Sequence, residues 1–311
     1  MAQLDAITLK QLRAISAIHA CGSITSAADM LNLTVPAVST QLKNIEANIG
    51  ADLLIRSNDG KGSLTLQGQQ VVATINQIES ALEHCYKSIV AINSGKSGHV
   101  SLGVVSTGKY YAPSIVALAK KSLPDIHIDL VIGNRQSMVS ALENHSLDLV
   151  IMGRPPRFPM VESVALGDHP HVLIAPPDHH LVVNCDITPE ALLAETMILR
   201  EPGSGTRILM ERFLDRIGEG RTYDSIEFNT NETIKQAVIA GLGIALISAH
   251  TVSDALTDGR IVAIDMPGLP IIRKWYLVCA ADAGKTPVSQ SVHDFIVAQS
   301  DSFFPFLPSK R

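Results

Sequence analysis

Short runs of apolar residues at helical spacing, separated by tight turns, occupy the first 50 residues of the chain. This spacing predicts amphipathic helices rather than strands. The first helix begins after Thr8, whose hydroxyl can cap it, and ends at Gly22. A second helix is expected from about Thr25 to Leu31, and a third begins after Thr34 and ends at Gly50.

The second and third helices are joined by a three-residue turn, which is the outline of a helix-turn-helix motif. In the third helix, Val38, Leu42 and Ile45 are expected to face the core. The apolar segment 53–55 and the segment 63–66 follow, separated by a Gly- and Asp-containing turn, and this pattern predicts a two-stranded wing. We therefore expect a winged helix-turn-helix domain over residues 1–66.

From Gln67 onward the hydrophobic period changes to alternating steps of four and three residues. This narrow apolar seam over about three heptads is typical of a helix that pairs with another helix. An ordinary amphipathic helix on the surface of its own domain is the alternative. We expect a linker helix over residues 67–95 that joins two copies of the chain in a homodimer. The seam consists of Val71, Ile75, Ile78, Leu82, Cys85, Ile89 and Ile92.

Beyond residue 95, apolar strand patterns alternate with helical patterns. This alternation predicts a parallel sheet covered by helices on both faces. A second round of the same pattern begins with a strand at 171–175, and the last strand and helix of the chain are expected to return to the first lobe. The predicted fold class is α/β with an all-α N-terminal part. Two lobes are expected within residues 96–311, at about 96–165 with 268–311 and at about 166–267. A cleft between such lobes is a common place for a small ligand.

Composition narrows the possible partners. The chain has 311 residues, with 25 Lys and Arg against 30 Asp and Glu, so its formal net charge is −5. Bulk charge alone would not hold such a protein on nucleic acid. The longest apolar run, residues 237–249, is shorter than a membrane-spanning helix, and the N-terminus lacks the pattern of a signal peptide. We expect a cytoplasmic protein that does not associate with membranes.

Fragments of known catalytic motifs occur, but each lacks a required residue. Residues 95–97 and 284–286 resemble the end of a P-loop without its first glycine. The four cysteines (Cys21, Cys85, Cys185 and Cys279) have no zinc-binding spacing, and we interpret them as small buried hydrophobic residues. Four clustered histidines (His169, His171, His179 and His180) are interpreted as structural or solvated. We therefore expect no catalytic residues, no metal and no cofactor.

The stretch LREPGSGTR (199–207) follows a predicted strand and opens a predicted helix. Backbone N–H groups at a helix start, together with serine and threonine hydroxyls, form a site for an anion. Arginine side chains could add bidentate hydrogen bonds to a phosphate or a carboxylate. A simple turn with surface arginines is the alternative. The first lobe has a parallel arrangement at Ser106, Thr107 and Lys109, with Arg135 after its second strand, so the cleft suits a ligand with charge at both ends.

At this point the residues resemble a known family. The stretch TLKQLRAISAIHACGSITSAADMLNLTVPAVSTQLKNIEANIGADLLIR (8–56) resembles the winged helix-turn-helix of LysR-type transcriptional regulators. The long seam resembles their linker helix, and the two lobes resemble their effector domain, which has the type 2 periplasmic-binding-protein-like fold. The resemblance spans the whole chain.

Several stretches are more specific within that family. They are VVSTGKYYAP (104–113), IMGRPP (151–156), LIAPPDHHL (173–181), REPGSGTR (200–207) and NETIKQAVIAGLGI (231–244). These stretches are similar to CbbR-type regulators, which control Calvin-cycle carboxylase operons in response to phosphorylated metabolites. Regulators of sulfur and nitrogen assimilation carry related stretches and are the alternative.

The resemblance implies a homotetramer, double-stranded operator DNA as one partner and a small anionic metabolite as another. The residues predicted to contact DNA are Thr34, Pro36, Ser39, Thr40, Gln41, Lys43, Arg56 and Lys61. The residues predicted to hold the effector are Ser106, Thr107, Lys109, Arg135, Arg154, Arg200, Ser204, Gly205, Thr206, Arg207 and Asn231. Sugar bisphosphates, phosphoenolpyruvate, phosphoglycolate, nucleotides and sulfate-like anions all suit this set.

The sequence departs from the family pattern in its DNA-binding part. Val35 stands where the family usually has glutamine, so one hydrogen bond to a base edge is absent. In the wing, Lys61 is set against Asp59, and residues 1–95 hold six Lys and Arg against seven Asp and Glu. We expect weak nonspecific attraction to phosphates and a dependence on several recognition helices binding together. A ligand-binding protein or an enzyme that uses the cleft would leave residues 1–95 unexplained.

Overall fold

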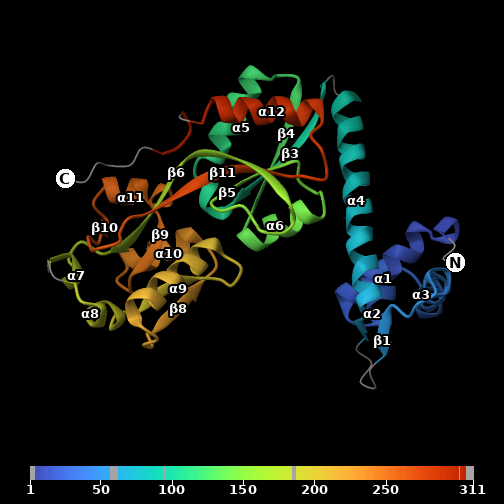
Figure 1. The fold of residues 1–311 in the computed structure, drawn as a ribbon, viewed down its shortest axis with the longest axis horizontal. Coiled ribbons are helices and arrows are strands. Elements are labelled where there is room, and N and C mark those ends of the chain that lie inside the picture. Colours follow the sequence, from blue (N-terminus) through green and yellow to red (C-terminus); the bar gives the residue numbers. More distant parts are fainter. Residues whose placement is uncertain (1–3, 57–61, 94–95, 184–186, 301, 306–311) are drawn as a thin grey trace. The chain divides into compact units, whose positions relative to one another are not determined.

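The computed structural model describes residues 4–56, 62–93, 96–183, 187–300 and 302–305. The chain forms two compact units, residues 1–85 and residues 86–311 (Figure 1). Helix α4 (Leu66–Asn93) contributes residues to both units. Among the helices of the described residues, none combines the length and the hydrophobicity needed to cross a membrane.

The helix ends of the first unit follow the caps predicted from the sequence. Helix α1 (Leu9–Cys21) begins with a complete capping box between Thr8 and Gln11. Helix α2 (Ile24–Leu31) begins one residue earlier than expected, because the Ser23 hydroxyl accepts a hydrogen bond from the Ser26 N–H. Helix α3 (Val35–Ile49) is capped by Thr34 and ends at Gly50, and the short helix η1 (Leu4–Ala6) precedes all three.

The core of this unit is formed by one face of each helix. Ile15, Val38 and Ile45 are fully buried, and Ile75 of α4 packs into the same cluster. The wing consists of β1 (Leu54–Arg56) antiparallel to β2 (Gly62–Leu64). The second strand ends two residues before the expected position because the Thr65 hydroxyl accepts a hydrogen bond from the Gly68 N–H, which starts α4. Residues 57–61, with Asp59 and Lys61, lie outside the described residues.

Along α4 the apolar seam divides into two parts. Its first part, including Ile75 and Ile78, packs on the helices of the first unit. The second part is exposed: Leu82 is 47%, Ile89 is 50% and Ile92 is 58% accessible. Cys85 in the same seam is also exposed, so the prediction that the cysteines are buried is wrong at this position. An exposed continuation of a buried seam is the geometry expected of a helix that pairs with another helix.

In the second unit, the first lobe has the predicted parallel arrangement. Strands β5 (Leu149–Met152), β3 (Gly98–Val105) and β4 (Ile126–Gly133) lie side by side in that order and run parallel. Helix α5 (Ala112–Ser122) packs on β4, and helix α6 (Arg135–Glu143) packs on β3 and β5. In Figure 1 these two helices cover opposite faces of the sheet.

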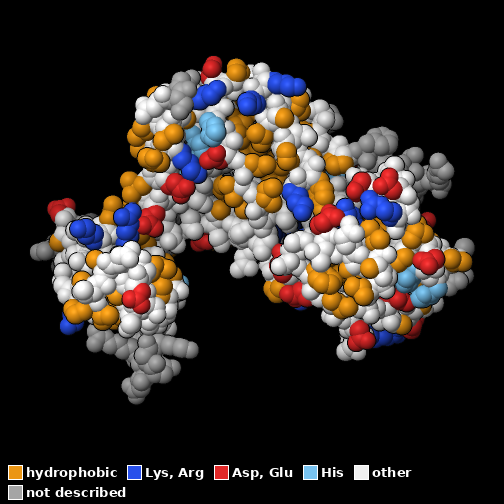
Figure 2. Space-filling view, turned by 180° about the vertical axis from the view of Figure 1, so that it is seen from behind, with side chains coloured by type: hydrophobic (Ala, Val, Ile, Leu, Met, Phe, Trp, Pro, Cys, Tyr) orange, Lys and Arg blue, Asp and Glu red, His pale blue; other side chains and the backbone are white. Residues whose placement is uncertain are grey.

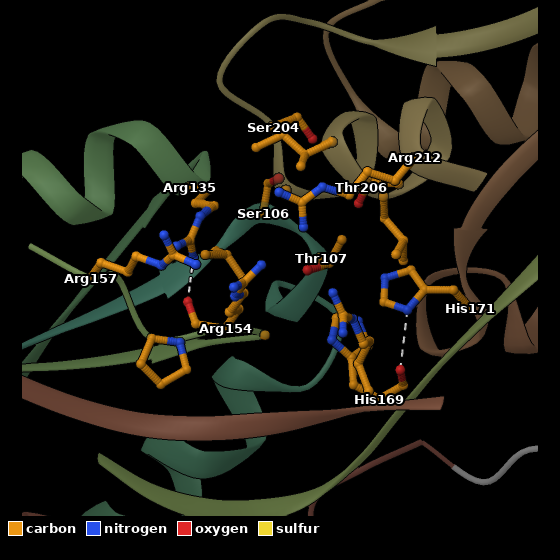
Figure 3. A pocket seen from close by; sticks show the side chains of 17 residues that line it. Ser106, Thr107, Arg135, Arg154, Arg157, His169, His171, Ser204, Thr206 and Arg212 are labelled. Carbon is orange, nitrogen blue, oxygen red and sulfur yellow. Dashed lines mark hydrogen bonds between the residues drawn. The ribbon is translucent and has the colours of Figure 1, made fainter. Parts of the chain in front are cut away.

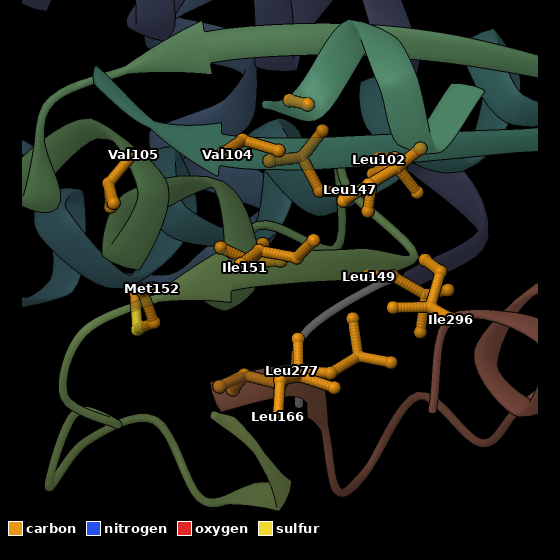
Figure 4. Packing of buried hydrophobic residues seen from close by; sticks show 14 of the residues in the cluster. Leu102, Val104, Val105, Leu147, Leu149, Ile151, Met152, Leu166, Leu277 and Ile296 are labelled. Carbon is orange, nitrogen blue, oxygen red and sulfur yellow. The ribbon is translucent and has the colours of Figure 1, made fainter. Parts of the chain in front are cut away.

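The end of the chain returns to this lobe, as expected. Strand β11 (Ile271–Ala280) pairs antiparallel with β5, and helix α12 (Pro287–Ala298) packs on β3 beside α5. Figure 4 shows the resulting core, in which Leu102, Leu149 and Ile296 come from three distant parts of the sequence and are all fully buried. Burial of these side chains is the main source of this lobe's stability.

Strand β6 (Val161–Ala175) differs from the sequence prediction, which placed a strand only at 171–175. Its first part alternates polar and apolar residues and contains Pro170, so no apolar run marks it as a strand. Its partner is β11, about a hundred residues later in the chain, and the two strands pair along most of their length. Because β6 continues through the expected lobe boundary at 165–166, one sheet links both lobes.

The second lobe is built on the far end of β6. Strands β9 (Ala245–Ser248) and β10 (Val262–Ala263) pair with β6, while β7 (Met197–Arg200) and β8 (Ser225–Phe228) form a parallel pair. Successive strand residues alternate between two apolar clusters, one against α8 and α9 and the other against α10 and α11. The helices are α7 (His180–Val183), α8 (Pro189–Leu193), α9 (Gly205–Gly218), α10 (Asn231–Ile239) and α11 (Ser253–Thr257), with the short helices η2 (Ser106–Gly108) and η3 (Ala249–Thr251).

Candidate functional site

A cavity of about 400 Å³ lies between the two lobes of the second unit (Figure 3). The start of η2 and the segment after β5 line it from the first lobe, and the start of α9 lines it from the second. Strands β6 and β11, which link the lobes, contribute the remaining wall. Its side chains that can bond a ligand are Ser106, Thr107, Arg135, Arg154, Arg157, His169, His171, Ser204, Thr206, Arg212 and Arg273.

The cavity carries a large excess of positive charge. Five arginines line it, and no aspartate or glutamate is among its described lining residues. Across the described part of the chain, none of these five arginines forms an ion pair with a carboxylate. Burial and the nearby Arg154 lower the pKa of Arg135, which donates a hydrogen bond to the Arg154 carbonyl. An anion between these guanidinium groups would relieve their mutual repulsion.

The start of α9 adds backbone donors to this site. Ser204 is its N-cap residue, but the Ser204 side chain makes no capping hydrogen bond. Helices α6 and α10 differ in this respect, because Asn134 and Thr230 cap them with their own side chains. The first N–H groups of α9 therefore lack a side-chain cap at the point where Ser204 and Thr206 line the cavity. This is the arrangement in which a helix start binds an anion.

The predicted recognition helix presents a small polar face. Val38 and Leu42 are buried, as expected, whereas Pro36, Thr40 and Lys43 are exposed. Thr34 is exposed, and Ser39 and Gln41 are half-buried. Arg56 is the last residue of β1, but its side chain, like Lys61, lies outside the described part of the chain.

Val35, at the start of this helix, is 42% exposed, so its methyl groups are available to the methyl group of a thymine. On the face drawn in Figure 2, basic side chains are interspersed with acidic and hydrophobic ones. That view contains no continuous basic surface, which agrees with the chain's 25 Lys and Arg against 30 Asp and Glu.

Known proteins match the two parts of the chain separately. Residues 9–69 match the family described as bacterial regulatory helix-turn-helix protein, lysR family. Residues 93–301 match the family described as LysR substrate binding domain. The chain belongs to the LysR family. It is therefore a DNA-binding transcriptional regulator, and the predicted family and fold class are confirmed.

Individual relatives extend this result over the whole chain. The HTH-type transcriptional regulator CbbR of Cereibacter sphaeroides is 46% identical over 310 residues, which are 99% of this chain and 100% of that protein. The regulatory domain of Synechocystis PCC6803 CcmR, solved in complex with 2-PG, is 29% identical with a TM-score of 0.61, covering 66% of this chain and 98% of that one. Full-length CbnR, solved with its target DNA, is 18% identical with a TM-score of 0.66, covering 94% and 100%, and supports the LysR fold.

Of the effector residues predicted for this LysR-family chain, seven line the cavity. They are Ser106, Thr107, Arg135, Arg154, Ser204, Gly205 and Thr206. Arg200 does not line it. It is only 2% exposed, and its guanidinium donates to both carboxylate oxygens of Glu201, at 2.7 and 2.8 Å, and to the Ser106 hydroxyl at 3.1 Å. A third nitrogen donates to Asn231, which also does not line the cavity, so the structure places both of these predicted effector residues in a buried network.

Arg207 and Lys109 are the other two residues that lie outside the cavity. Arg207 donates to the carboxylates of Glu211, at 2.7 Å, and Glu227, and these hydrogen bonds raise its pKa. Lys109 lies over the ring of Tyr110, with its Nζ 5.1 Å from the ring centre. Both cations thus have partners within the protein, which the sequence alone did not show.

Residues that the sequence analysis missed complete the site. Ser204, Ile208 and Arg212 follow one another at four-residue spacing, so they share one face of α9, and all three line the cavity. Arg207 is three residues from Ser204 and bonds Glu211 and Glu227 away from the cavity. The spacing of four was therefore a usable signal for Arg212. Arg157, in the loop between β5 and β6, offered no comparable signal.

Two histidines and an arginine reach the cavity only because β6 and β11 pair. His169 is the pairing partner of Arg273, and His171 lies two residues further along β6. Both histidines are buried rather than solvated, and both line the cavity. The Nδ1–H of His171 donates a hydrogen bond to the His169 carbonyl oxygen at 3.1 Å, and burial lowers the pKa of His171 to about 4.

The other two clustered histidines lie elsewhere in the second lobe. His179 and His180 each place Nε2 3.2 Å from a carboxylate oxygen of Glu195. The Leu181 N–H donates to Nδ1 of His179 at 3.3 Å, which leaves the ring proton of neutral His179 on Nε2, directed at Glu195. Hydrogen bonds therefore account for this cluster.

Proposed function

We propose that this LysR-family regulator controls carbon-fixation genes of the Calvin cycle in the cytoplasm. Its operator binding would respond to a small anionic, phosphorylated metabolite bound between the two lobes. The observation that carries the proposal is the cavity with five arginines and no acidic lining residue. The full-length similarity to a CbbR regulator supports the target genes, and the CcmR domain that was solved with 2-PG supports the ligand class.

The lining of the cavity favours a phosphate over a singly charged carboxylate. A phosphate dianion accepts several hydrogen bonds and neutralises two positive charges, and guanidinium groups match its geometry with two parallel N–H donors. Arg135, Arg154 and Arg157 gather on one side of the cavity in Figure 3, while Ser106, Thr107, Ser204 and Thr206 lie near its centre. A phosphorylated molecule placed there would be contacted from both lobes.

Contacts across the lobes explain how such a ligand would change the shape of the unit. Several polar contacts already connect the lobes; among them, the Gln136 N–H donates to the Gly203 carbonyl at 3.2 Å, and Arg200 donates to Ser106. A ligand bonded to Thr107 on one side and to Thr206 on the other would favour the closed arrangement of the lobes. It can shift the equilibrium only by its difference in affinity for the two arrangements, typically about 1–3 kcal/mol.

On the DNA side, we propose contacts through α3, principally the half-buried Ser39 and Gln41 and the exposed Lys43, with Arg56 beside the wing. Since net positive charge is lacking in this part of the chain, a single copy would bind weakly. The exposed seam of α4, from Leu82 to Ile92, is the surface through which two copies would form a homodimer. Pairs of dimers in a homotetramer would then hold the operator at several recognition helices together.

The proposal is tested by footprinting of the purified full-length protein on the promoter region of a Calvin-cycle carboxylase operon of its own genome. The salt concentration is held fixed, and the panel contains ribulose bisphosphate, phosphoenolpyruvate, phosphoglycolate and sulfate. We expect a protected region that shortens or shifts with one phosphorylated compound. If no phosphorylated compound changes the footprint, the proposed ligand class is wrong. If the protein protects no region of this promoter, the proposed target genes are wrong.

Two matched variants locate the response. Arg154→Ala removes a cavity arginine, and Arg207→Ala removes an arginine of α9 that does not line the cavity and is bonded to glutamates. Arg154→Ala is expected to keep the footprint and to lose the response to the metabolite by about tenfold or more, as one charged hydrogen-bond partner is lost. Arg207→Ala is expected to respond as the unaltered protein does. The reverse outcome would move the ligand out of this cavity.

A further inference from the structure

His169 has an unusual environment for a buried histidine. It is 4% exposed and lines the cavity, and neither Nδ1 nor Nε2 has a hydrogen-bond partner within the described residues. The two neighbouring buried histidines differ, because His171 Nδ1 lies 3.1 Å from a carbonyl oxygen and His250 Nδ1 accepts a hydrogen bond from the Trp275 indole N–H at 3.1 Å. Buried polar atoms usually have partners, and exceptions in native proteins tend to have a functional reason.

The packing around His169 holds its ring in place at the cavity wall. The ring stacks on Trp275, with 3.6 Å between ring centres and an angle of 14° between planes. Gly153, which also lines the cavity, lies directly opposite Nδ1: a Cβ atom at this position would approach Nδ1 to 2.9 Å. Glycine at 153 therefore leaves room for the imidazole where it lines the cavity, and any side chain there would displace the ring.

The charge state of His169 indicates what it can bond. Burial lowers the pKa of His169 well below its ordinary value, and the neighbouring His171 of β6, His250 of η3 and Arg273 of β11 lower it further. The imidazole is thus neutral near pH 7, with one nitrogen that donates and one that accepts a hydrogen bond. A hydroxyl group can serve as a partner to either nitrogen. In Figure 3, His169 lies at the opposite end of the cavity from Arg135 and Arg157.

We propose that His169 is a specificity-determining residue, which hydrogen-bonds a hydroxyl group of the effector while the arginines hold its phosphate. This inference rests on the proposed function and narrows it to one ligand class, the phosphorylated compounds that carry a hydroxyl group several bonds from the phosphate. Gly153 supports this role by leaving room for the imidazole itself. An effector without a hydroxyl group would leave the nitrogens of His169 without a partner and would bind less tightly.

The test measures the binding of matched ligand pairs to the full-length protein by titration calorimetry. The pairs are ribose 5-phosphate with 2-deoxyribose 5-phosphate, and glycerol 3-phosphate with propyl phosphate; inorganic phosphate serves as the reference. We expect the unaltered protein to bind the hydroxylated member of at least one pair about tenfold more tightly. His169→Phe keeps an aromatic ring on Trp275 but removes both nitrogens, so it should lose this preference while retaining its affinity for inorganic phosphate.

Two further variants separate the proposal from a structural effect. His250→Phe makes the same change in a buried histidine that does not line the cavity, and it should keep the preference. Gly153→Ala keeps both nitrogens of His169 but presses a methyl group against Nδ1, which displaces the imidazole, so it should reduce the preference even if His169→Phe fails to fold. A folded His169→Phe variant that keeps the preference would overturn this inference but not the proposed function. The same holds for an unaltered protein that binds these phosphates without any preference. An unaltered protein that binds none of these phosphates would contradict the proposed function as well.

Discussion

Two groups of arginines lie within one unit of this protein and behave differently. The arginines of the cavity, such as Arg154 and Arg212, have no carboxylate partner within the described residues. Arg200 and Arg207, only a few residues from the start of α9, are bonded to Glu201, Glu211 and Glu227. The first group places uncompensated positive charge at an open cavity, whereas the second holds parts of the second lobe together.

The difference shows that the spacing of charges along a sequence does not reveal which of them are neutralised. Arg207 stands next to a glycine-rich turn and a helix start, which favoured it as a ligand contact. It lies, however, one turn of helix before Glu211, and a bond at this spacing is among the commonest within a helix.

Arg200→Ala is expected to have the largest effect. Arg200 is almost fully buried, and its removal would leave Glu201, Asn231 and Ser106 without their common partner. Loss of one member of a buried ion pair typically costs about 3–5 kcal/mol in the free energy of unfolding. Chemical denaturation of the full-length protein, followed by circular dichroism, measures this change. A cost below about 1 kcal/mol would mean that the bonds of Arg200 contribute little to the stability of the fold.

Acid is expected to weaken the fold next, through the histidines beside the cavity. The pKa values of His171 and His250 are lowered to about 4, mainly by burial, whereas the unfolded chain has an ordinary histidine pKa near 6.5. Between these values the unfolded state binds more protons, so stability is fully present above about pH 6.5 and falls as the pH decreases toward 4. At pH 5 the loss is about 2 kcal/mol for each histidine.

Denaturation curves at pH 7 and pH 5 check this dependence on pH. In His250→Phe, one of the two contributions should disappear, so the difference between the two curves should become smaller. An unchanged difference would mean that His250 is accessible to protons in the folded protein. Neither group of arginines titrates in this range, so the change is assigned to the histidines.

Arg207→Ala is expected to have the smallest effect on stability. Its side chain is 22% exposed, and its glutamate partners are more exposed still. Ion pairs of this kind contribute up to about 1 kcal/mol, and less at high salt. Denaturation at low and high salt measures the change. A loss as large as that of Arg200→Ala would show that the two arginines stabilise the protein as a single network.

The parts of the fold that the sequence predicted are those determined locally. Thr8, Gly22, Thr34 and Gly50 fix helix ends through bonds to residues within one turn, so their effect is visible in the sequence itself. The parallel strands of the first lobe are apolar runs, which mark buried strands.

The parts that the sequence did not predict depend on contacts between distant segments. The first part of β6 is held by β11 rather than by its own apolar pattern, and His169, His171 and Arg273 reach the cavity through that pairing. Six of the seven predicted effector residues that line the cavity stand at element starts, which the pattern locates, and Arg154 closely follows the end of β5. Arg200 was misplaced because its partner Asn231 comes from another helix start.

The two faces of α9 make different contacts, and this difference affects how a regulator of this family can acquire a new ligand. The face with Ser204, Ile208 and Arg212 is available to a ligand, while Arg207 and Glu211 are bonded to each other. Substitutions on the first face can alter the molecule that is sensed without removing an interaction that holds the domain together. A duplicated gene could therefore acquire a new signal through single-residue changes and still produce a folded protein.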